Sequence, residues 1–205
     1  DRYYFSKPKN VISTQGVLSE YSDQETIPKT GLIVIGGKSR HYHFRKNVLS
    51  QQIEWLLNDV FKDYKWKITT SPRSPNLDQP SHPGNAEFYS WKDTAEDWLS
   101  NEMMQSEVTF LTPESVSVLY EGLSTKTMVY VFHHEHHIDD QYGSKRKTKV
   151  TRNINKLKKQ GNIGYIDSKR HMLSRSIKSA EIIHPQKNIH LKEVKRVVKE
   201  LLERL

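Results

Sequence analysis

Short apolar runs alternate with amphipathic segments along the first two thirds of the chain. The run within Gly31–Gly37 is continuous and bounded by glycines, which predicts a strand that is buried on both faces. Four further short runs predict strands at 66–70, 86–91, 107–111 and 128–132. Segments with apolar residues at three-to-four spacing predict helices at 48–61, 94–104 and 112–123.

This alternation predicts the fold class. Strands that are separated by segments of helical length favour a parallel, doubly wound sheet with helices on both faces. We therefore expect an α/β fold with a Rossmann-like parallel sheet. Sheets of this kind bind ligands just beyond the carboxyl ends of their strands. The conspicuous polar residues of this sequence follow the predicted strands.

The two ends of the chain have a different pattern. Residues 1–30 are polar and irregular, and we expect a linker or arm with one short strand near Val11–Ser13. The core is expected at 31–142, and a C-terminal helical segment that packs on it at 143–205. The chain begins at Asp1 rather than Met, so we expect a fragment of a longer protein.

Three helices are predicted in the C-terminal segment. The stretch 143–161 is rich in lysine and arginine, without an acidic residue, and its spacing allows a basic helix with Val150, Ile154 and Leu157 inward. A second helix is predicted at 168–180 and a third at 191–205. The third has a strong apolar stripe, formed by Val194, Val197, Val198, Leu201 and Leu202.

Composition narrows the classes of function. The chain has 205 residues and a formal net charge of +8, which favours polyanionic partners such as phosphates. It contains no cysteine, which excludes disulfides and thiolate metal sites. No stretch approaches the roughly 20 apolar residues of a membrane helix. We expect a cytoplasmic protein, with peripheral membrane association as an open alternative.

The first candidate site follows the first predicted strand. Glycine allows backbone N–H groups to approach a phosphate closely, and Gly36 and Gly37 are followed by Lys38 and Ser39. This is neither the dinucleotide-binding fingerprint nor a P-loop. The alternative interpretation is a plain turn.

A second candidate follows the second strand, where Thr70 and Arg73 offer a hydroxyl and a guanidinium to phosphate or sugar oxygens. The alternative is an ordinary turn with an exposed arginine.

The third candidate is the start of the helix at 112–123. Thr112 is a suitable N-cap, and orphan N–H groups near Ser115 and Ser117 favour an anion. Further along, the carboxylate of Glu121 suits the vicinal diol of a ribose. Glu114 weakens the anion argument, because its own charge already complements the helix dipole.

The histidine-rich run 133–137 follows the last strand of the core. Imidazoles beside a carboxylate are metal-binding groups, but adjacent residues of a strand point to opposite faces, so at most two converge. We therefore expect no metal site. Contact with the ligand is favoured, and His133 and His134 are the candidates for a catalytic acid or base.

The basic segment 145–159 suits a phosphate-rich surface. It has no interleaved aromatic residues, which argues against base stacking and hence against nucleic acid. A solvated helix remains the alternative.

Several motifs in a shared order resemble the mitochondrial-fission family, the "elongated mitochondria" proteins of plants and their bacterial relatives. The matching pieces are Asn10–Leu18, Ile35–Ser39, Thr69–Pro75, Leu111–Glu121, Met128–Phe132, Asn155–Gly161 and the closing helix. Where relatives usually carry a Gly-Lys-Pro turn, this chain has Thr125-Lys126-Thr127.

The resemblance implies the C-terminal lobe of a two-lobed GT-B-like glycosyltransferase. It implies that Ser115, Ser117 and Glu121 hold the phosphate and ribose of a nucleotide sugar, and that Gly36–Lys38 face the cleft between lobes. The expected ligand is a nucleoside-diphosphate sugar, with uridine as the expected base and no further cofactor. The expected partner is a missing N-terminal lobe of the same chain. Alternatives are a nucleotide-sugar epimerase and a non-catalytic interaction module related to organelle or membrane division.

Overall fold

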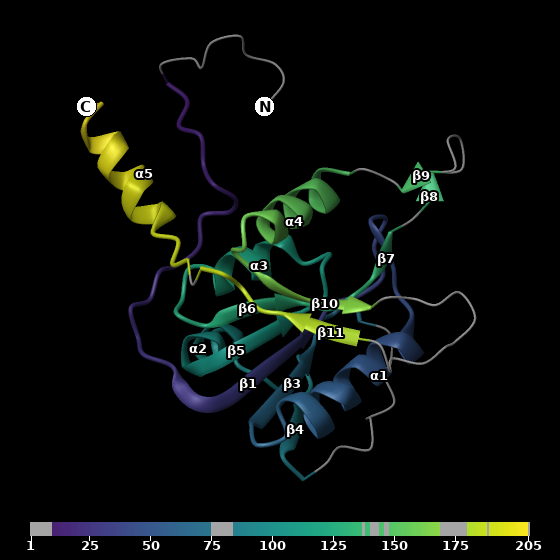
Figure 1. The fold of residues 1–205 in the computed structure, drawn as a ribbon. Coiled ribbons are helices and arrows are strands. Elements are labelled where there is room, and N and C mark those ends of the chain that lie inside the picture. Colours follow the sequence, from purple (N-terminus) through teal and green to yellow (C-terminus); the bar gives the residue numbers. More distant parts are fainter. Residues whose placement is uncertain are drawn as a thin grey trace.

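A mostly parallel sheet forms the centre of the computed structural model (Figure 1), which describes residues 10–74, 84–136, 138–139, 144–145, 148–168, 180–187 and 189–204. Within these residues the sheet has seven strands in the order β11-β10-β6-β5-β1-β3-β4. Neighbouring strands are parallel except β10 and β11. The strands are β1 (Ile27–Ile35), β3 (Lys65–Thr70), β4 (Ala86–Tyr89), β5 (Ser106–Leu111), β6 (Met128–Val131), β10 (Gly164–Ser168) and β11 (Ala180–Ile183).

Counted along the chain, the six parallel strands have the spatial order 3-2-1-4-5-6. This is the order of doubly wound dinucleotide-binding folds. The predicted fold class, an α/β fold with a Rossmann-like parallel sheet, is therefore confirmed. The strand order reverses between β1 and β5, which are hydrogen-bonded neighbours.

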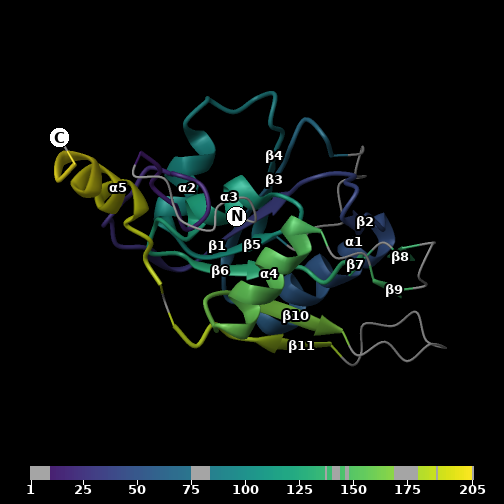
Figure 2. The same ribbon diagram turned by 90° about the horizontal axis from the view of Figure 1, so that it is seen from above.

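Helices cover both faces of the sheet (Figures 1 and 2). One face packs against α1 (Lys46–Trp55) and its π-helical continuation η1 (Leu56–Val60). The other packs against α2 (Trp98–Gln105), α3 (Val116–Gly122) and α4 (Lys149–Lys159). The apolar run of β1 supplies both layers, because Leu32 and Val34 lie on one face and Ile33 and Ile35 on the other.

Aromatic side chains fill the core beneath α1. Phe110 of β5 is fully buried and stacks on Tyr130 of β6, with ring centroids 4.6 Å apart. Phe61 and Trp66 close the cluster from the α1 side and from β3. These rings anchor β5 and β6, whose carboxyl ends carry candidate site residues.

Two short ribbons lie beyond the carboxyl edge of the sheet. β2 (Tyr42–His43) pairs antiparallel with β7 (Glu135–His136). This pairing joins the segment after β1 to the segment after β6. β8 (Ile138–Asp139) pairs with β9 (Ser144–Lys145).

The C-terminal segment differs from the predicted set of helices. The helix predicted at 168–180 is wrong at both ends, because Ser168 ends β10 and Ala180 begins β11. Residues 169–179 lie outside the described residues. The two strands extend the sheet beyond β6, so the segment 143–205 is not only helical.

The N-terminal arm also differs from the prediction, because Val11–Ser13 forms no strand. Instead the arm lies along α5 (Glu193–Leu202), which stands away from the sheet at the upper left of Figure 1. The Gln15 N–H donates to Glu193 at 2.7 Å, and Arg196 donates to the Ser13 carbonyl at 2.6 Å. Among the described residues, no helix is long and apolar enough to cross a membrane.

Candidate ligand-binding site at the switch point

The carboxyl ends of β1 and β5 meet where the strand order reverses. Val34 and Leu111 are register partners, and the Thr112 N–H donates to the Val34 carbonyl at 3.3 Å. The chain then leaves β1 toward α1 on one face and leaves β5 toward α3 on the other. Divergent connections of this kind open a crevice, and doubly wound folds bind their ligands there.

A hydrogen-bonded relay joins the ends of β1 and β5. The Gly36 N–H donates to the Thr112 hydroxyl at 2.7 Å, and that hydroxyl donates to Glu114 Oε1 at 2.9 Å. A Cβ atom on Gly36 would lie 1.8 Å from the same Glu114 oxygen. Gly36 is therefore required for the close approach of this carboxyl. Thr112 contacts the β1 end rather than capping a helix, so the predicted N-cap at Thr112 is wrong and α3 begins only at Val116.

Glu114 is buried beside the glycine turn, with 8% of its surface exposed. Burial raises the pKa of its carboxyl, while hydrogen bonds from its own backbone, from Thr112 and from the Gly37 backbone oppose the shift, as does the charge of Arg73. The Gly36 and Gly37 backbones thus already have partners. The carboxyl of Glu114 lies where the sequence predicts a phosphate.

The turn after β3 is fastened to the turn after β1. A Cβ on Gly37 would lie 1.9 Å from the Arg73 carbonyl oxygen, so only glycine allows these backbones to touch. The Ser74 hydroxyl lies 2.7 Å from the carbonyl oxygens of both Ile35 and Gly36 and donates to them. Sequence reasoning missed Ser74, although it stands in the Thr69–Pro75 motif. The Arg73 side chain is exposed at this edge.

The remaining residues of the first two candidates have distinct roles. Thr70 ends β3 opposite Ile35. Lys38 is exposed, whereas Ser39 shapes the turn, because its hydroxyl accepts from the N–H groups of His41 and Tyr42 at 3.1 and 3.3 Å. The structure thus brings together the ends of β1, β3 and β5.

The three residues predicted to contact the ligand from α3 do not lie together in the structure. Ser115 is the N-cap residue, but its side chain makes no capping hydrogen bond, and Ser117 is exposed. The Glu121 carboxylate lies on the side of α3 that faces α2, where it accepts a short hydrogen bond from Ser100. Among the described contacts, none links Glu121 to the glycine turn. Glu114, not Glu121, is the carboxyl at the switch point.

Comparison with known proteins identifies the family. The sequence pattern described as mitochondrial fission ELM1 matches residues 1–205. The chain belongs to the mitochondrial fission ELM1 family. A solved structure, the DNA/pantothenate metabolism flavoprotein from Streptococcus pneumoniae, is similar with a TM-score of 0.38 and 11% sequence identity, over 89% of this chain and 98% of that one. None of the curated proteins matches this chain.

In this ELM1-family domain, Gln52 of α1 positions the histidine-rich run. Its amide exchanges two hydrogen bonds with the His133 backbone, donating to the carbonyl at 3.0 Å and accepting from the N–H at 2.8 Å. Gln52 is a buried polar residue on an apolar helix face, which was a signal for such a role that the sequence analysis did not use. Arg45 adds an ion pair with Glu135 at 2.8 Å.

The next residue, His134, packs against Phe44, with ring centroids 5.9 Å apart. Both of its ring nitrogens are buried. Burial lowers its pKa to about 4 and the charge of His133 adds to the shift, whereas hydrogen bonds with the backbones of Phe132 and His133 oppose it. His134 is therefore neutral at pH 7. Within the described residues, no group of three or more histidine or acidic side chains is arranged to hold a metal; His137 lies outside them.

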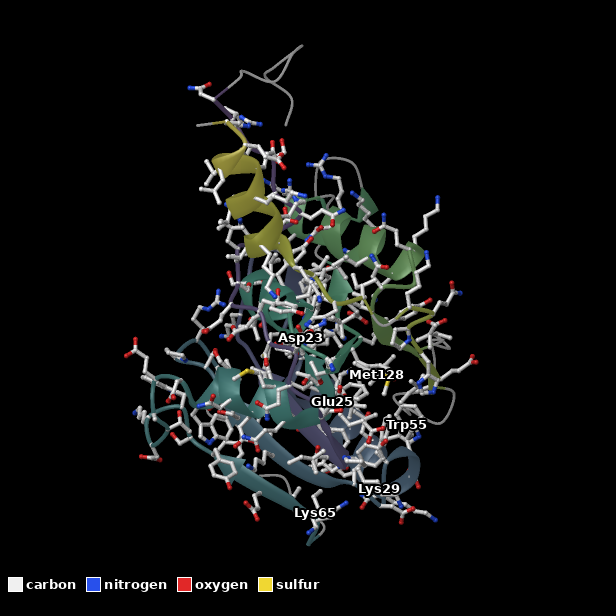
Figure 3. The ribbon with its side chains drawn as sticks, turned by 90° about the vertical axis from the view of Figure 1, so that its left-hand side faces the viewer. Asp23, Glu25, Lys29, Trp55, Lys65 and Met128 are labelled. Atoms are coloured by element: carbon white, nitrogen blue, oxygen red, sulfur yellow. The ribbon has the colours of Figure 1, made fainter. Side chains whose placement is uncertain are left out.

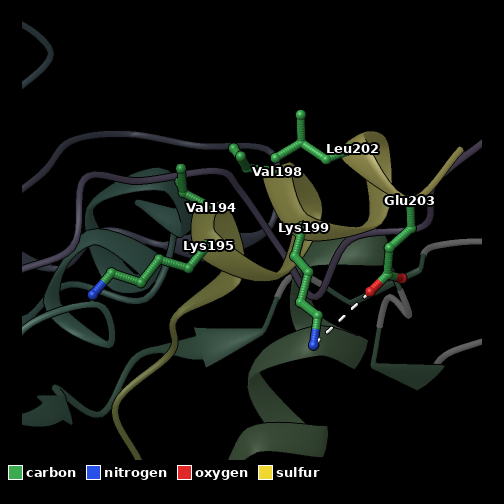
Figure 4. A pocket seen from close by; sticks show the side chains of 6 residues that line it. All are labelled: Val194, Lys195, Val198, Lys199, Leu202 and Glu203. Atoms are coloured by element: carbon green, nitrogen blue, oxygen red, sulfur yellow. Dashed lines mark ion pairs between the residues drawn. The ribbon is translucent and has the colours of Figure 1, made fainter. Parts of the chain in front are cut away.

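Two cavities of the ELM1-family domain lie away from the switch point. One, of about 480 Å³, is a groove on α5 with Val194, Val198 and Leu202 along its apolar wall (Figure 4). Another, of about 450 Å³, lies near the amino ends of β1 and β3, where Figure 3 labels Lys65 of its lining. Beside His134 there is a cavity of only about 10 Å³, room for about one water.

Proposed function

We propose that this domain binds a nucleoside-diphosphate sugar at the crevice between β1 and β5, as the donor-binding lobe of a GT-B-like glycosyltransferase. The observation that carries the proposal is the relay from Gly36 through Thr112 to Glu114, which lies at the reversal of a 3-2-1-4-5-6 sheet. Doubly wound sheets bind nucleotides at this reversal. The resemblance to GT-B-like proteins supplies the class of nucleotide.

Exposed cations beside the crevice suit the diphosphate. Lys38 follows the glycine turn, and Arg73 follows β3, whose turn contacts the glycine turn directly. Arginine and lysine form strong charge-assisted hydrogen bonds with phosphate oxygens. The hydroxyls of Ser115 and Ser117 add neutral donors on the side of α3. In glycosyl transfer such groups stabilise the charge that develops on the departing diphosphate.

The state of His134 removes one of the two histidines that could supply the acid or base of an epimerase. Epimerisation needs an acid and a base beside the sugar. His134 has both nitrogens buried and a pKa of about 4, so it is neutral and shielded from any ligand in this conformation. A transferase that positions its donor and neutralises the diphosphate does not require it. In such a transferase the acceptor would bind to a second, facing lobe.

A second candidate function is a non-catalytic interaction module that uses α4. The exposed lysines and arginine of this helix, which has no acidic residue, favour it; they are Lys149, Arg152, Lys156 and Lys159. Lys158 does not belong to this surface, because its ammonium lies 4.4 Å from the Tyr165 ring centroid and burial lowers its pKa to about 8.

Titration calorimetry with UDP-glucose and UDP tests the proposed function. We expect the wild-type chain to bind both, and Lys38→Ala or Arg73→Ala each to weaken binding about 10-fold to 100-fold, the effect of losing one charged hydrogen bond. Lys187→Ala is the matched control, because Lys187 is exposed at the opposite edge of the sheet, and its affinity should equal that of the wild type.

Absence of nucleotide binding would contradict the proposal. If, in addition, the chain bound anionic vesicles and lost that binding when Lys149, Arg152 and Lys156 were replaced by glutamine, the interaction module would be favoured instead. Nucleic-acid binding would appear as an affinity that falls steeply with salt.

A further inference from the structure

A buried carboxyl at a predicted phosphate site is a conflict that needs a physical explanation. Gly36 and Gly37 resemble an anion-binding turn, yet the Gly36 N–H donates to Thr112, and the Gly37 backbone is hydrogen-bonded to Glu114. A phosphate in this turn would find these groups already engaged. It would also lie close to the Glu114 carboxyl in a poorly solvated place, where the ionised form of this carboxyl repels phosphate strongly.

The same carboxyl can bind a neutral ligand group. An ionised carboxylate offers about four lone-pair directions. Three groups already use this capacity, namely the Thr112 hydroxyl and the backbones of Gly37 and Glu114. Glu114 is 8% exposed as a whole residue, and about one lone-pair direction of its carboxylate is left for a donor group of a ligand.

Tyr42 adds a second polar group just after the glycine turn, where its N–H donates to the Ser39 hydroxyl at 3.3 Å. Its side chain is 4% exposed, and its buried hydroxyl has no hydrogen-bond partner in the described part of the chain. Burial raises the pKa of Tyr42, and the charge of Glu114 raises it further. A buried hydroxyl without a partner usually marks the position of a water or a ligand.

We propose that Glu114 is a specificity-determining residue of the switch-point site, which accepts a hydroxyl of the donor sugar and keeps phosphate out of the glycine turn. The proposal rests on the proposed function, because it assigns the parts of a nucleotide sugar to parts of that site. The sugar lies toward Glu114 and Tyr42. The diphosphate lies outside the glycine turn, toward the exposed side chains of Lys38 and Arg73.

Calorimetry on Glu114→Gln tests this assignment. Glutamine keeps the shape of the side chain and an oxygen acceptor for Thr112, but it removes the charge. We expect the wild type to prefer UDP-glucose over UDP by about 10-fold, the effect of one hydrogen bond to a charged group, and Glu114→Gln to reduce that preference to about two-fold or less. We also expect affinity for inorganic pyrophosphate to rise at least about 10-fold, because the repulsion is gone. Glu203→Gln changes an exposed acid at the C-cap of α5, far along the chain; it is the matched control and should behave as the wild type.

A ligand-side series keeps the test independent of how well the variant folds. Derivatives of UDP-glucose that each lack one sugar hydroxyl are titrated into the wild-type chain, and one of them should bind about 10-fold more weakly. With the Glu114→Gln variant, the same derivative should bind as tightly as UDP-glucose does. Equal preferences in wild type and Glu114→Gln, or equal affinity of all derivatives, overturn this inference while leaving the proposed function intact. No binding of either nucleotide by the wild type overturns both.

Discussion

Phe110→Ala is expected to lower the free energy of unfolding by about 3–5 kcal/mol, the usual loss when a fully buried aromatic residue is truncated. Phe110 has no exposed surface and contacts four other aromatic rings, those of Phe61, Trp66, Tyr130 and Phe132. Its loss leaves a cavity between β5 and its neighbours, directly before the Thr112–Glu114 segment. Urea denaturation followed by circular dichroism measures the change.

Phe88→Ala is the matched control for this prediction. Phe88 lies on β4 at the edge of the sheet and is only partly buried against the same cluster. The same substitution at Phe88 should therefore lower the free energy of unfolding clearly less than at Phe110. A loss at Phe110 that is no larger than the loss at Phe88 would contradict the assignment of Phe110 to the centre of the core.

His134 is expected to make the domain sensitive to acid. Its pKa falls from 6.5 to about 4 on folding, so the unfolded chain binds a proton at a pH where the folded chain does not. The folded state carries no penalty from this histidine above pH 6.5. The penalty grows as the pH falls toward 4, because the unfolded chain is then protonated and the folded chain is not. At about 1.4 kcal/mol per pKa unit, the contribution is about 3 kcal/mol.

The measurement is the free energy of unfolding between pH 7 and pH 4 for the wild type and for His134→Phe, whose ring suits the apolar contact with Phe44. The variant should lose about 3 kcal/mol less over this range. Because every other titrating group is retained, including Glu114 with its opposite shift, the difference between the two profiles isolates His134. Parallel profiles would show that the imidazole is hydrated in the folded protein.

The sequence predicted the strands whose apolar runs are buried on both faces, because a short continuous apolar run is typical of such a strand. β1, β5 and β6 are of this kind. β10 and β11 escaped notice for a physical reason. They are short, they lie toward one edge of the sheet, and they carry polar residues such as Asp167 and Glu181, so neither shows a continuous apolar run.

The candidate site was predictable in position but not in its contacts. Glycines after a strand predicted a close approach, and the structure has one at both Gly36 and Gly37. The approaching groups could not be read from the pattern, since Glu114 follows Pro113 and therefore resembles an exposed acid in the first turn of a helix. Only the tertiary contact from Gly36 through Thr112 draws it inward.

The most direct test of the central claim is to locate the bound nucleotide on the domain. Backbone amide chemical shifts are recorded by NMR while UDP-glucose is added to the isotope-labelled chain. We expect the largest changes in Gly36–Ser39, at Arg73 and in Thr112–Ser117, where β1, β3 and β5 end. Changes confined to the α5 groove or to the cavity near Lys65, or no changes at all, would contradict the claim that this fold binds a nucleotide at its switch point.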